Sequence, residues 1–432
     1  MTVSTFLHAA DLHLDAPLAT LDLAGDAEAR ARVRRASRDA FTRLIDHALR
    51  RHVAFVVIAG DLWDGTWQDV HTGLWFVAQL ARLEAAGIEV VFLRGNHDAA
   101  SEVTPLLRWP GNVHEFETDK AGTIHLERHG VALHGQGFAQ RHVSANLAAA
   151  YPPPVSGRLN VGVLHTALDG LPGHAPYAPC TVVELAARGY DYWALGHVHG
   201  FQVLGEAPWI VFAGCLQGRH ANETGPKGAV EVDFAGDRIL AVRHVALDVV
   251  RWARPVIDLE GAAELEALDD RAGRVLRATA SAAGSGIDLV VVRPRFVGRT
   301  PLHETLLVEQ KPIEARIGGL AAATSPRTVI EAFEWRTEAP RGPAVPLADE
   351  AVLALLAALD DVSGSAEHRA ALLELVRQIA ERVPLEVLAH LRAGPLADLF
   401  EGDVAAFLAR RRMMARAVLE REARGETVDA AG

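Results

Sequence analysis

Five short motifs rich in aspartate, histidine and asparagine occur in the first two hundred residues. In chain order they are Asp11-Leu-His13, Gly60-Asp61-Leu-Trp-Asp64, Gly95-Asn96-His97-Asp98, a lone His165 and Gly196-His197-Val-His199. Carboxylate and amide oxygens are hard donors and imidazole nitrogen is a borderline one, a mixture that suits divalent ions such as manganese. Two such ions held ~3.5–4 Å apart across one bridging carboxylate can hydrolyse phosphoesters. The motifs therefore predict a two-metal centre that acts on a phosphoester.

Each motif follows a short apolar run with the composition of a buried strand. The runs are residues 3–9, 55–59, 90–93, 161–164 and 192–195, and β-branched and aromatic residues are frequent in them. In an open α/β sheet, ligands collect beyond the carboxyl ends of the strands, so five such loops can converge on one point. A single Asp-x-His or His-x-His pair is more often a turn or a solvated pair. The shared order and strand context favour a metal site.

The same motifs resemble those of the calcineurin-like metallophosphoesterases. Two longer stretches, residues 10–17 and 214–228, resemble more narrowly the bacterial DNA repair exonucleases of the YhaO type, relatives of the nuclease subunit of the SbcCD complex. The resemblance extends over roughly residues 1–340 and is loose beyond them. It implies an α/β fold, the four-layer metallophosphoesterase β-sandwich flanked by helices, and hydrolysis of phosphodiester bonds in DNA.

The resemblance also implies seven metal ligands in two sets that share one member. The first ion would be held by Asp11, His13, Asp61 and His199. The second would be held by Asp61, Asn96, His165 and His197. Asp61 is then the bridge between two divalent ions, which we expect to be manganese, and together the ions would activate a water for in-line attack on phosphorus.

Other motif residues are expected to act on the substrate. The resemblance implies that His97 stabilises the phosphate and protonates the leaving 3′ oxygen, because an imidazole has a pKa near the operating pH. Asp64 occupies a position where some relatives have a second histidine, and we expect it to fix His97 by a hydrogen bond. Asp98 is interpreted as a further partner orienting His97, with a helix N-cap as the alternative. Arg219 and His220 are candidate phosphate contacts.

Composition limits the class of protein. The 432 residues include 43 basic and 55 acidic ones, a net charge of −12 that argues against non-specific coating of nucleic acid. Bound ions add positive charge that this count omits, so a nuclease is still allowed. The chain has two cysteines without C-x-x-C spacing and no signal-peptide pattern, which predicts a cytoplasmic protein. It has no long apolar run, which predicts that it does not bind membranes.

Arginines cluster near the start of the chain, in its middle and near its end. The first cluster, within residues 30–38, is interpreted as a solvated helix face. The second consists of Arg293, Arg295 and Arg299, on an apolar strand beside a turn. We interpret this second cluster as the better candidate for a wall of the DNA site.

Three regions follow from the pattern of elements. Residues 1–250 alternate strands and helices and end in strand-like runs at 209–212, 229–234 and 239–246, which fit the second sheet of the sandwich. Residues 251–338 predict a small α+β domain with a helix at 262–280, a strand at 288–296, a helix from near Pro301 and a strand at 328–335. The resemblance implies that this domain caps the DNA cleft.

The third region is expected to be helical. Three prolines within residues 338–346 predict a linker, and apolar residues at helical spacing predict helices within 347–424. Two interpretations stay open. The helices pack as an ordinary bundle, or they dock on an SMC-like ATPase, as the resemblance implies.

The sequence therefore predicts a metal-dependent DNA exonuclease or endonuclease that acts in DNA repair with an SMC-like ATPase partner. The oligomeric state stays open, a homodimer included. One alternative is a phosphodiesterase or phosphatase that acts on small phosphoesters. Another is a non-catalytic scaffold that keeps the fold only to bind a partner.

Overall fold

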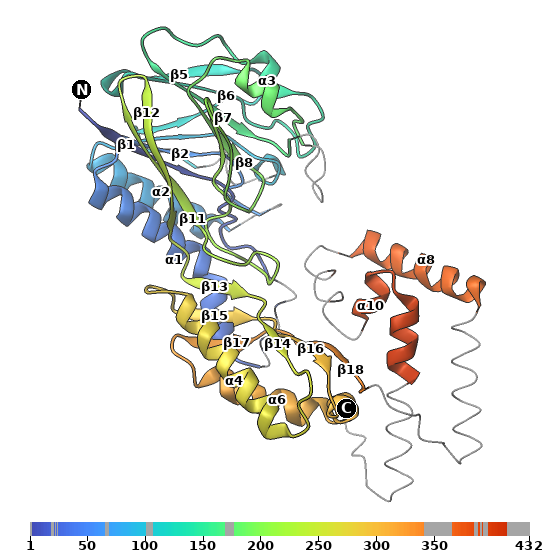
Figure 1. Ribbon diagram of the computed structural model, residues 1–432. Coiled ribbons are helices and arrows are strands. Elements are labelled where there is room, and N and C mark those ends of the chain that lie inside the picture. Colours follow the sequence, from blue (N-terminus) through green and yellow to red (C-terminus); the bar gives the residue numbers. More distant parts are fainter. Residues whose placement is uncertain are drawn as a thin grey trace, which may run out of the picture. The chain divides into compact units, whose positions relative to one another are not determined.

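The computed structural model describes residues 2–18, 21, 23, 25–64, 69–100, 107–168, 177–340, 365–383, 388, 391 and 396–412 (Figure 1). The chain divides into two compact units. Unit 1 comprises Met1–Pro17, Ala31–Arg219 and Glu223–Arg251, and unit 2 comprises Leu18–Arg30, His220–Asn222 and Trp252–Gly432. Most of the predicted linker, at 341–346, and residues 347–364 and 413–424 of the predicted helical region lie outside the described residues.

Unit 1 contains two six-stranded mixed sheets. The order of the first is β12 (Arg238–Ala246), β11 (Gly228–Ala235), β1 (Ser4–Ala9), β2 (Phe55–Ile58), β3 (Glu89–Phe92) and β4 (Val113–Glu115). The order of the second is β5 (Gly122–Leu126), β6 (Val131–Gly135), β7 (Leu159–His165), β8 (Tyr192–Gly196), β10 (Trp209–Phe212) and β9 (Gln202–Glu206). In both sheets the central strands are parallel. Antiparallel pairs occur at one edge of the first sheet, where β4 at the other edge is parallel, and at both edges of the second.

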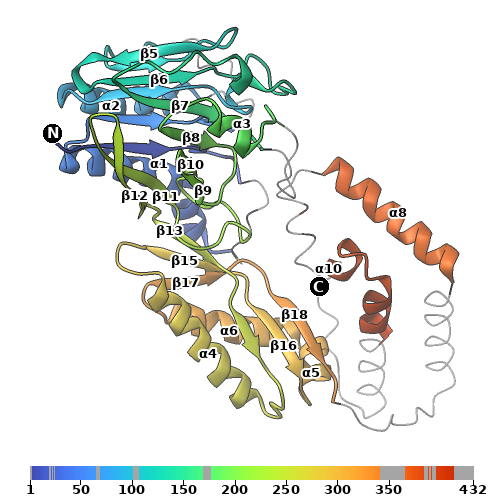
Figure 2. The same cartoon turned by 45° about the horizontal axis from the view of Figure 1, so that its top comes forward.

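Unit 1 is layered, with helices outside its two sheets (Figure 2), and apolar side chains join the layers. Side chains such as Phe6, Val57 and Val163 pack the two sheets face to face. Helices α1 (Ala27–Arg51) and α2 (Val70–Ala85) cover the outer face of the first sheet, and the short helix α3 (Val182–Ala186) packs with loop residues on the outer face of the second. Because the central strands are covered on both faces, they appear in the sequence as continuous apolar runs.

The second sheet differs from its predicted composition. Of the three late strand-like runs assigned to it, only β10 belongs there, beside β8. β11 pairs with β1 in antiparallel orientation, with Val230 opposite His8, and β12 continues the first sheet beyond β11. The local pattern of apolar residues is similar in both sheets. The sheet to which β11 and β12 belong is therefore decided by the pairing of β11 with β1, more than two hundred residues earlier in the chain.

Residues 250–338 form two three-stranded sheets and three helices. One sheet has the order β13 (Val250–Ala253), β15 (Leu289–Val292) and β17 (Arg327–Ile330), and the other β14 (Val256–Asp258), β16 (Arg295–Arg299) and β18 (Glu334–Glu338). The helices are α4 (Leu265–Ala282), α5 (His303–Val308) and α6 (Gln310–Ala322). The strand pairs β15–β17, β14–β16 and β16–β18 are parallel, so the arrangement is α/β rather than the predicted α+β.

Both long strands predicted in this unit are pairs of shorter ones. The predicted strand 288–296 is β15 followed by β16, and 328–335 is β17 followed by the start of β18. Pro294 lies at the first break, where a residue without an N–H cannot continue a ladder. The carbonyl of Pro294 accepts a hydrogen bond from the backbone N of Glu334, 2.9 Å away, so the two breaks face each other.

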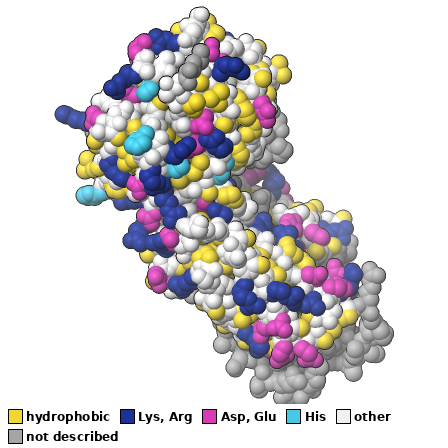
Figure 3. Space-filling model, turned by 60° about the vertical axis from the view of Figure 1, so that its left-hand side comes forward, with side chains coloured by type: hydrophobic (Ala, Val, Ile, Leu, Met, Phe, Trp, Pro, Cys, Tyr) yellow, Lys and Arg dark blue, Asp and Glu magenta, His cyan; other side chains and the backbone are white. Residues whose placement is uncertain are grey.

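The predicted wall of arginines is wrong for Arg293. Its side chain is only 3% exposed, and it forms an ion pair with Glu331 at 2.8 Å. Arg295 and Arg299 are more exposed, but each pairs with a glutamate at 2.6 Å. On the face drawn in Figure 3, basic side chains are interspersed with acidic ones. This cluster therefore stabilises unit 2 through ion pairs.

The described C-terminal residues are helical and contact β18. Helices α8 (Ala366–Arg382) and α10 (Ala397–Phe400) and the helical residues 404–412 share a small apolar core. Asp398, 2% exposed, pairs with Arg336 of β18 and, at 3.0 Å, with Arg410. None of the helices in the described part of the chain is long and apolar enough to cross a membrane.

His8 is a buried histidine of the core between the sheets. Its Nδ1 lies 3.0 Å from the hydroxyl of Tyr192, and its Nε2 lies 3.2 Å from the carbonyl oxygen of Leu195. Burial lowers the pKa of His8 to about 3, against about 6.5 in an unfolded chain. Between these two values the unfolded chain binds a proton that the folded protein excludes. Stability is therefore lost as the pH falls below about 6.5.

We expect His8→Gln, which does not titrate in this range, to lose less stability than the wild type between pH 7 and pH 5. The two pKa values give a difference on the order of 2 kcal/mol in the free energy of unfolding. Denaturant unfolding followed by tryptophan fluorescence at both pH values measures it. Equal losses in the two proteins would contradict the assignment of a neutral, buried His8.

Candidate metal centre

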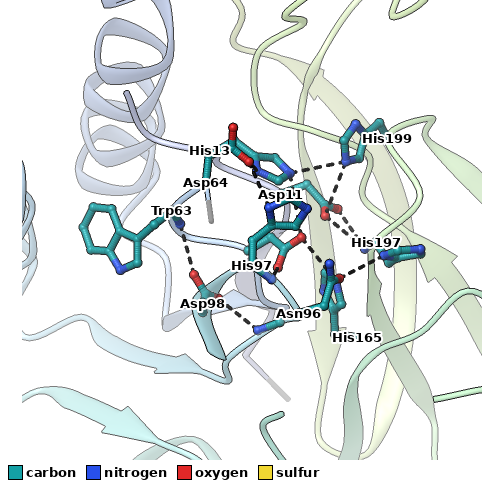
Figure 4. A network of polar contacts seen from close by, with 12 residues as sticks. Asp11, His13, Trp63, Asp64, Asn96, His97, Asp98, His165, His197 and His199 are labelled. Carbon is teal, nitrogen blue, oxygen red and sulfur yellow. Dashed lines mark hydrogen bonds and ion pairs between the residues drawn. The ribbon is translucent and has the colours of Figure 1, made fainter. Parts of the chain in front are cut away.

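Loops from both sheets bring polar side chains to one point in unit 1 (Figure 4). The loops follow β1, β2, β3 and β8, and the last residue of β7 joins them. The side chains that meet there are Asp11, His13, Asp61, Asn96, His165, His197 and His199. These are the seven residues that the motifs predict as metal ligands.

Two glycines allow the loops to approach each other closely. A Cβ atom at Gly95 would lie 2.2 Å from Oδ1 of Asp61, and a Cβ atom at Gly196 would lie 2.0 Å from the carbonyl oxygen of Ala59. A side chain at either position would have to displace part of the centre. This close approach explains why the third and fifth motifs each begin with glycine.

Four of the seven side chains project from left-handed backbone. The φ angle is 50° at Asp11, 41° at His13, 54° at Asp61 and 98° at His197. This region costs a non-glycine residue roughly 1–2 kcal/mol, and residues in it cluster at functional sites. The backbone N of Asp11 donates to the carbonyl of Gly60 at 3.0 Å, and that of His13 to Asp61 at 3.1 Å. The loops after β1 and β2 therefore hold each other in place.

At one end of the centre, Asn96 and two histidines surround the Asp61 carboxylate. Nε2 of His165 lies 3.4 Å from Oδ2 of Asp61 and 3.0 Å from Oδ1 of Asn96. The same Asn96 oxygen lies 3.2 Å from Nδ1 of His197. Nδ1 of His165 lies 2.9 Å from the carbonyl oxygen of Ala59. Because a carbonyl only accepts, His165 carries a proton on Nδ1 and, when neutral, directs the lone pair of Nε2 into the centre.

At the other end, Asp11, His13 and His199 face the same carboxylate. Nε2 of His13 lies 3.8 Å from Oδ2 of Asp61 and 3.4 Å from Nε2 of His199. Nε2 of His199 lies 3.8 Å from Oδ1 of Asp11. The Asp11 carboxylate also accepts hydrogen bonds from the backbone N of His197, at 3.1 and 2.9 Å. Asp61 therefore lies between two groups of donor atoms.

The donor set fits divalent cations. Asp11 and Asp61 are each 1% exposed, and His13 and His165 are 1% and 0% exposed. Burying carboxylates together with imidazole nitrogens that point at one another is costly unless a cation lies among them. The donor atoms of Asp11, His13 and His199 lie within 4.8 Å of one another, and so do those of Asp11, Asp61 and His165. Carboxylate, amide and imidazole donors together suit ions such as manganese, iron or zinc.

His97 and Asp64 lie beside this donor set. Nδ1 of His97 is 2.9 Å from Oδ1 of Asp64, an oxygen that also lies 3.6 Å from Nδ1 of His13. The backbone N of His97 donates to Oδ1 of Asp61 at 2.9 Å. Burial opposes the charged form of His97, but the carboxylates of Asp64 and Asp61 outweigh this effect and raise its pKa. The side chain is 27% exposed, so a substrate can reach it.

Asp98 joins two of the loops, which differs from its predicted contact with His97. Its Oδ1 accepts a hydrogen bond from the backbone N of Trp63 at 3.0 Å, and its Oδ2 accepts one from Gly95 at 2.9 Å. It is the first residue of the short helix η1 (Asp98–Ala100), so it is not the N-cap either. Burial and the charge of Asp61 raise the pKa of Asp98. The carboxyl group ties the Asp61 loop to the Asn96 loop.

The two predicted phosphate contacts have different positions. Arg219 belongs to unit 1, is 16% exposed at its side chain, and has Nη1 at 3.9 Å from Oδ1 of Asp64. His220 belongs to unit 2, where its Nδ1 accepts a hydrogen bond from the backbone N of Asn222 at 3.3 Å. Of the pair, Arg219 is the residue that unit 1 places beside the donor set.

Sequence reasoning assigned no role to Glu223 and Lys227, which support His199. Oε1 of Glu223 lies 2.5 Å from Nδ1 of His199, and Nζ of Lys227 donates to the carbonyl oxygen of His199 at 2.9 Å. Both residues are buried, at 6% and 7% exposure. The only sequence signal was an acidic and a basic residue within the stretch 214–228. Only the folded chain shows that they meet His199.

Two stretches of the chain match known protein families. Residues 4–201 match the family described as Calcineurin-like phosphoesterase, and residues 252–338 match the one described as Metallophosphoesterase YhaO, middle domain. The "Uncharacterized metallophosphoesterase YhaO" of Bacillus subtilis is 36% identical over 273 residues, which are 62% of this chain and 66% of that protein.

Proteins named "DNA double-strand break repair protein Mre11" are more distant relatives. The Methanopyrus kandleri protein is 29% identical over 210 residues, covering 44% of each chain. The Sulfurisphaera tokodaii protein is 26% identical over 234 residues, 49% of this chain and 57% of that one. The chain thus spans less than two thirds of the length of each of these three relatives. By its two family matches and these relatives, the chain is a calcineurin-like metallophosphoesterase of the YhaO type, related to the Mre11 proteins.

Proposed function

We propose that the protein is a two-metal DNA exonuclease or endonuclease that hydrolyses phosphodiester bonds in DNA repair. The observation that carries this proposal is the pairing of His97 with Asp64 beside the seven convergent donors, with Nδ1 of His97 2.9 Å from Asp64. The similarity to proteins named for DNA double-strand break repair supports DNA as the substrate. A phosphatase or phosphodiesterase for small phosphoesters is the nearest alternative, since it would need the same donors.

Two metal ions would be held by the two donor groups, with the Asp61 carboxylate shared between them. We expect manganese on the grounds of the mixed oxygen and imidazole donors. When bound, the ions would supply an acidified water as the nucleophile and would polarise the phosphate. The protein's own part is to keep the donors fixed, which the backbone hydrogen bonds between the β1 and β2 loops accomplish.

The side chains beside the donors would act on the phosphodiester. Asp64 engages Nδ1 of His97, which leaves Nε2 to donate a proton to the leaving 3′ oxygen. Arg219 is charged at every physiological pH and lies within reach of Asp64 and the donor set. We propose that its guanidinium contacts a phosphate oxygen of the substrate.

The remaining regions are proposed to serve the same reaction. Residues 1–250 would form the nuclease domain, 251–338 a domain that caps the DNA, and 347–424 a helical region that docks on an SMC-like ATPase. The apolar side chains of Leu375 and Ile379 on α8, 53% and 37% exposed, suit contact with partner helices. The ion pairs of Asp398 with Arg336 and Arg410 would anchor such a region to β18.

Cleavage of a labelled DNA duplex tests the proposal. The protein is stripped of metal and assayed with manganese, with chelator, and with manganese plus ATP and an SMC-like ATPase from the same genome. A panel of small phosphoesters is assayed in parallel. We expect manganese-dependent DNA cleavage that the ATPase stimulates. Hydrolysis of the small esters but not of DNA would favour the alternative, and inactivity on every substrate would favour a scaffold.

A further inference from the structure

We propose that Glu223 is a positioning residue that acts through His199 and makes the two ends of the metal centre unequal in affinity. The inference rests on the proposed function, because it takes His199 as a metal ligand. Nε2 of His199 faces Asp11 and His13, while Nδ1 of the same ring faces Glu223, on the side away from those two residues. Neither the motifs nor the family matches assign Glu223 a role.

The contacts of Glu223 fix both of its carboxylate oxygens. Oε1 lies 2.5 Å from Nδ1 of His199 and 3.5 Å from Nη2 of Arg219, which is itself 3.4 Å from that Nδ1. Oε2 accepts a hydrogen bond from the backbone N of Arg219 at 2.6 Å. The residue is 6% exposed, so water contributes little to its solvation. A carboxylate this close to Nδ1 keeps the proton on that nitrogen and leaves the lone pair of Nε2 for a cation.

The backbone of His199 is fixed by the same stretch of chain. Its carbonyl oxygen accepts hydrogen bonds from Nζ of Lys227 at 2.9 Å and from the backbone N of Cys215 at 3.2 Å. Residues 214–228 therefore engage His199 at its ring and at its carbonyl. With both points fixed, little orientational freedom is left for a metal to remove on binding.

At the end of the centre that contains His165, the ring nitrogen facing away from the donors has a neutral partner in place of a carboxylate. Nδ1 of His165 lies 2.9 Å from the neutral carbonyl oxygen of Ala59. A carboxylate partner increases the basicity of an imidazole ligand more than a neutral carbonyl does, because a full negative charge stabilises the polarised ring. The ion bound by His199 should therefore depend on a charge that the ion bound by His165 lacks.

The test is a manganese titration of the metal-free protein, in which electron paramagnetic resonance counts the free ion. We compare the wild type with Glu223→Gln, which keeps the shape and removes the charge. We expect one of the two affinities to weaken about 10- to 100-fold and the other to change little. Raising the manganese concentration should then restore most of the turnover, so the defect appears in the metal requirement.

The chain offers a matched control in Glu231. Glu231 lies on β11, outside the donor set, and its carboxylate has the same 6% side-chain exposure. It lies 2.9 Å from Nε2 of His47 on α1 and also pairs with Arg51 and Arg243, at 3.0 and 2.8 Å. Glu231→Gln thus removes the charge of another carboxylate that contacts a histidine, and it should leave both manganese affinities unchanged. Thermal unfolding of both variants separates loss of fold from loss of metal.

A second measurement keeps the proposal testable if Glu223→Gln proves unstable. Nitrogen-15 spectra of the histidine rings in the metal-free wild type should show His199 protonated at Nδ1, with the proton shifted downfield by its carboxylate partner. His199 protonated at Nε2, or unchanged manganese affinities in Glu223→Gln, would overturn the positioning role while the two-metal centre stands. A wild type that fails to bind two manganese ions would instead overturn the proposed function itself.

Discussion

Asp61→Ala should reduce the manganese content of the protein from two ions per chain to none and bring DNA cleavage to background. The Asp61 carboxylate faces both donor groups, with Oδ2 3.4 Å from Nε2 of His165 and 3.8 Å from Nε2 of His13. Its other oxygen holds the backbone N of His97 at 2.9 Å. Removing it therefore takes away a shared ligand, a negative charge and the anchor of the His97 loop together. Elemental analysis after equilibration with manganese, together with the duplex assay, measures both losses.

Asp61→Asn separates the charge from the shape. An asparagine oxygen can still accept the hydrogen bond from the backbone of His97, so the loop should stay in place while metal binding is lost. Asp233→Asn is the control for a carboxylate in the same unit, since Asp233 hydrogen-bonds Thr5 at 2.8 Å, away from the donor set. Two manganese ions bound by Asp61→Ala would show that the ligand assignment is wrong.

The strands that carry the motifs could be predicted because they are covered on both faces. β2 and β8 consist of fully buried residues, and such strands appear as uninterrupted apolar runs whatever surrounds them. β4 and β9 were not anticipated because they are short edge strands of mixed exposure. Their stability comes from neighbouring strands, which a local pattern does not reveal.

The convergence of the donors was predictable, but their support was not. Asp11, Asp61 and Asn96 follow β1, β2 and β3, neighbouring parallel strands of the first sheet, and parallel strands bring their ends to one edge of a sheet. Glu223 reaches His199 from 24 residues further along the chain, and it lies in the loop after β10, which has no periodic pattern. The same limit applies to Arg293, because a buried arginine paired with Glu331 has the same sequence signature as an exposed one.

Asp98 shows that the contact a side chain makes cannot be predicted from the residue next to it in the sequence. It follows His97 directly, which favoured a contact between the two. In the structure its carboxylate instead accepts backbone hydrogen bonds from Trp63 and Gly95, at 3.0 and 2.9 Å. A tight loop turns successive side chains in different directions, so the direction depends on backbone angles that the sequence pattern leaves open.

His97→Ala should retain both metals and DNA affinity while losing roughly 10²–10⁴-fold in cleavage rate, the range for a general acid. The ring of His97 contributes no atom to the two donor groups described above. Its Nδ1 is engaged by Asp64 at 2.9 Å, so its other nitrogen is the one available to a leaving group. Single-turnover cleavage of a labelled duplex, with manganese content and DNA binding measured on the same sample, separates chemistry from binding.

The leaving group distinguishes proton donation from a merely structural effect of His97. In an ester of p-nitrophenol the leaving group is p-nitrophenolate, a stable anion that needs no proton to depart. The 3′ oxygen of DNA, by contrast, is a poor leaving group unless it is protonated. His97→Ala should therefore be far less impaired on bis(p-nitrophenyl) phosphate than on DNA. Asp64→Asn, which keeps the imidazole but removes its charged partner, should show a smaller loss with the same substrate preference. Equal impairment of His97→Ala on both substrates would assign His97 to the architecture of the centre, and unchanged cleavage of DNA would remove it from the mechanism.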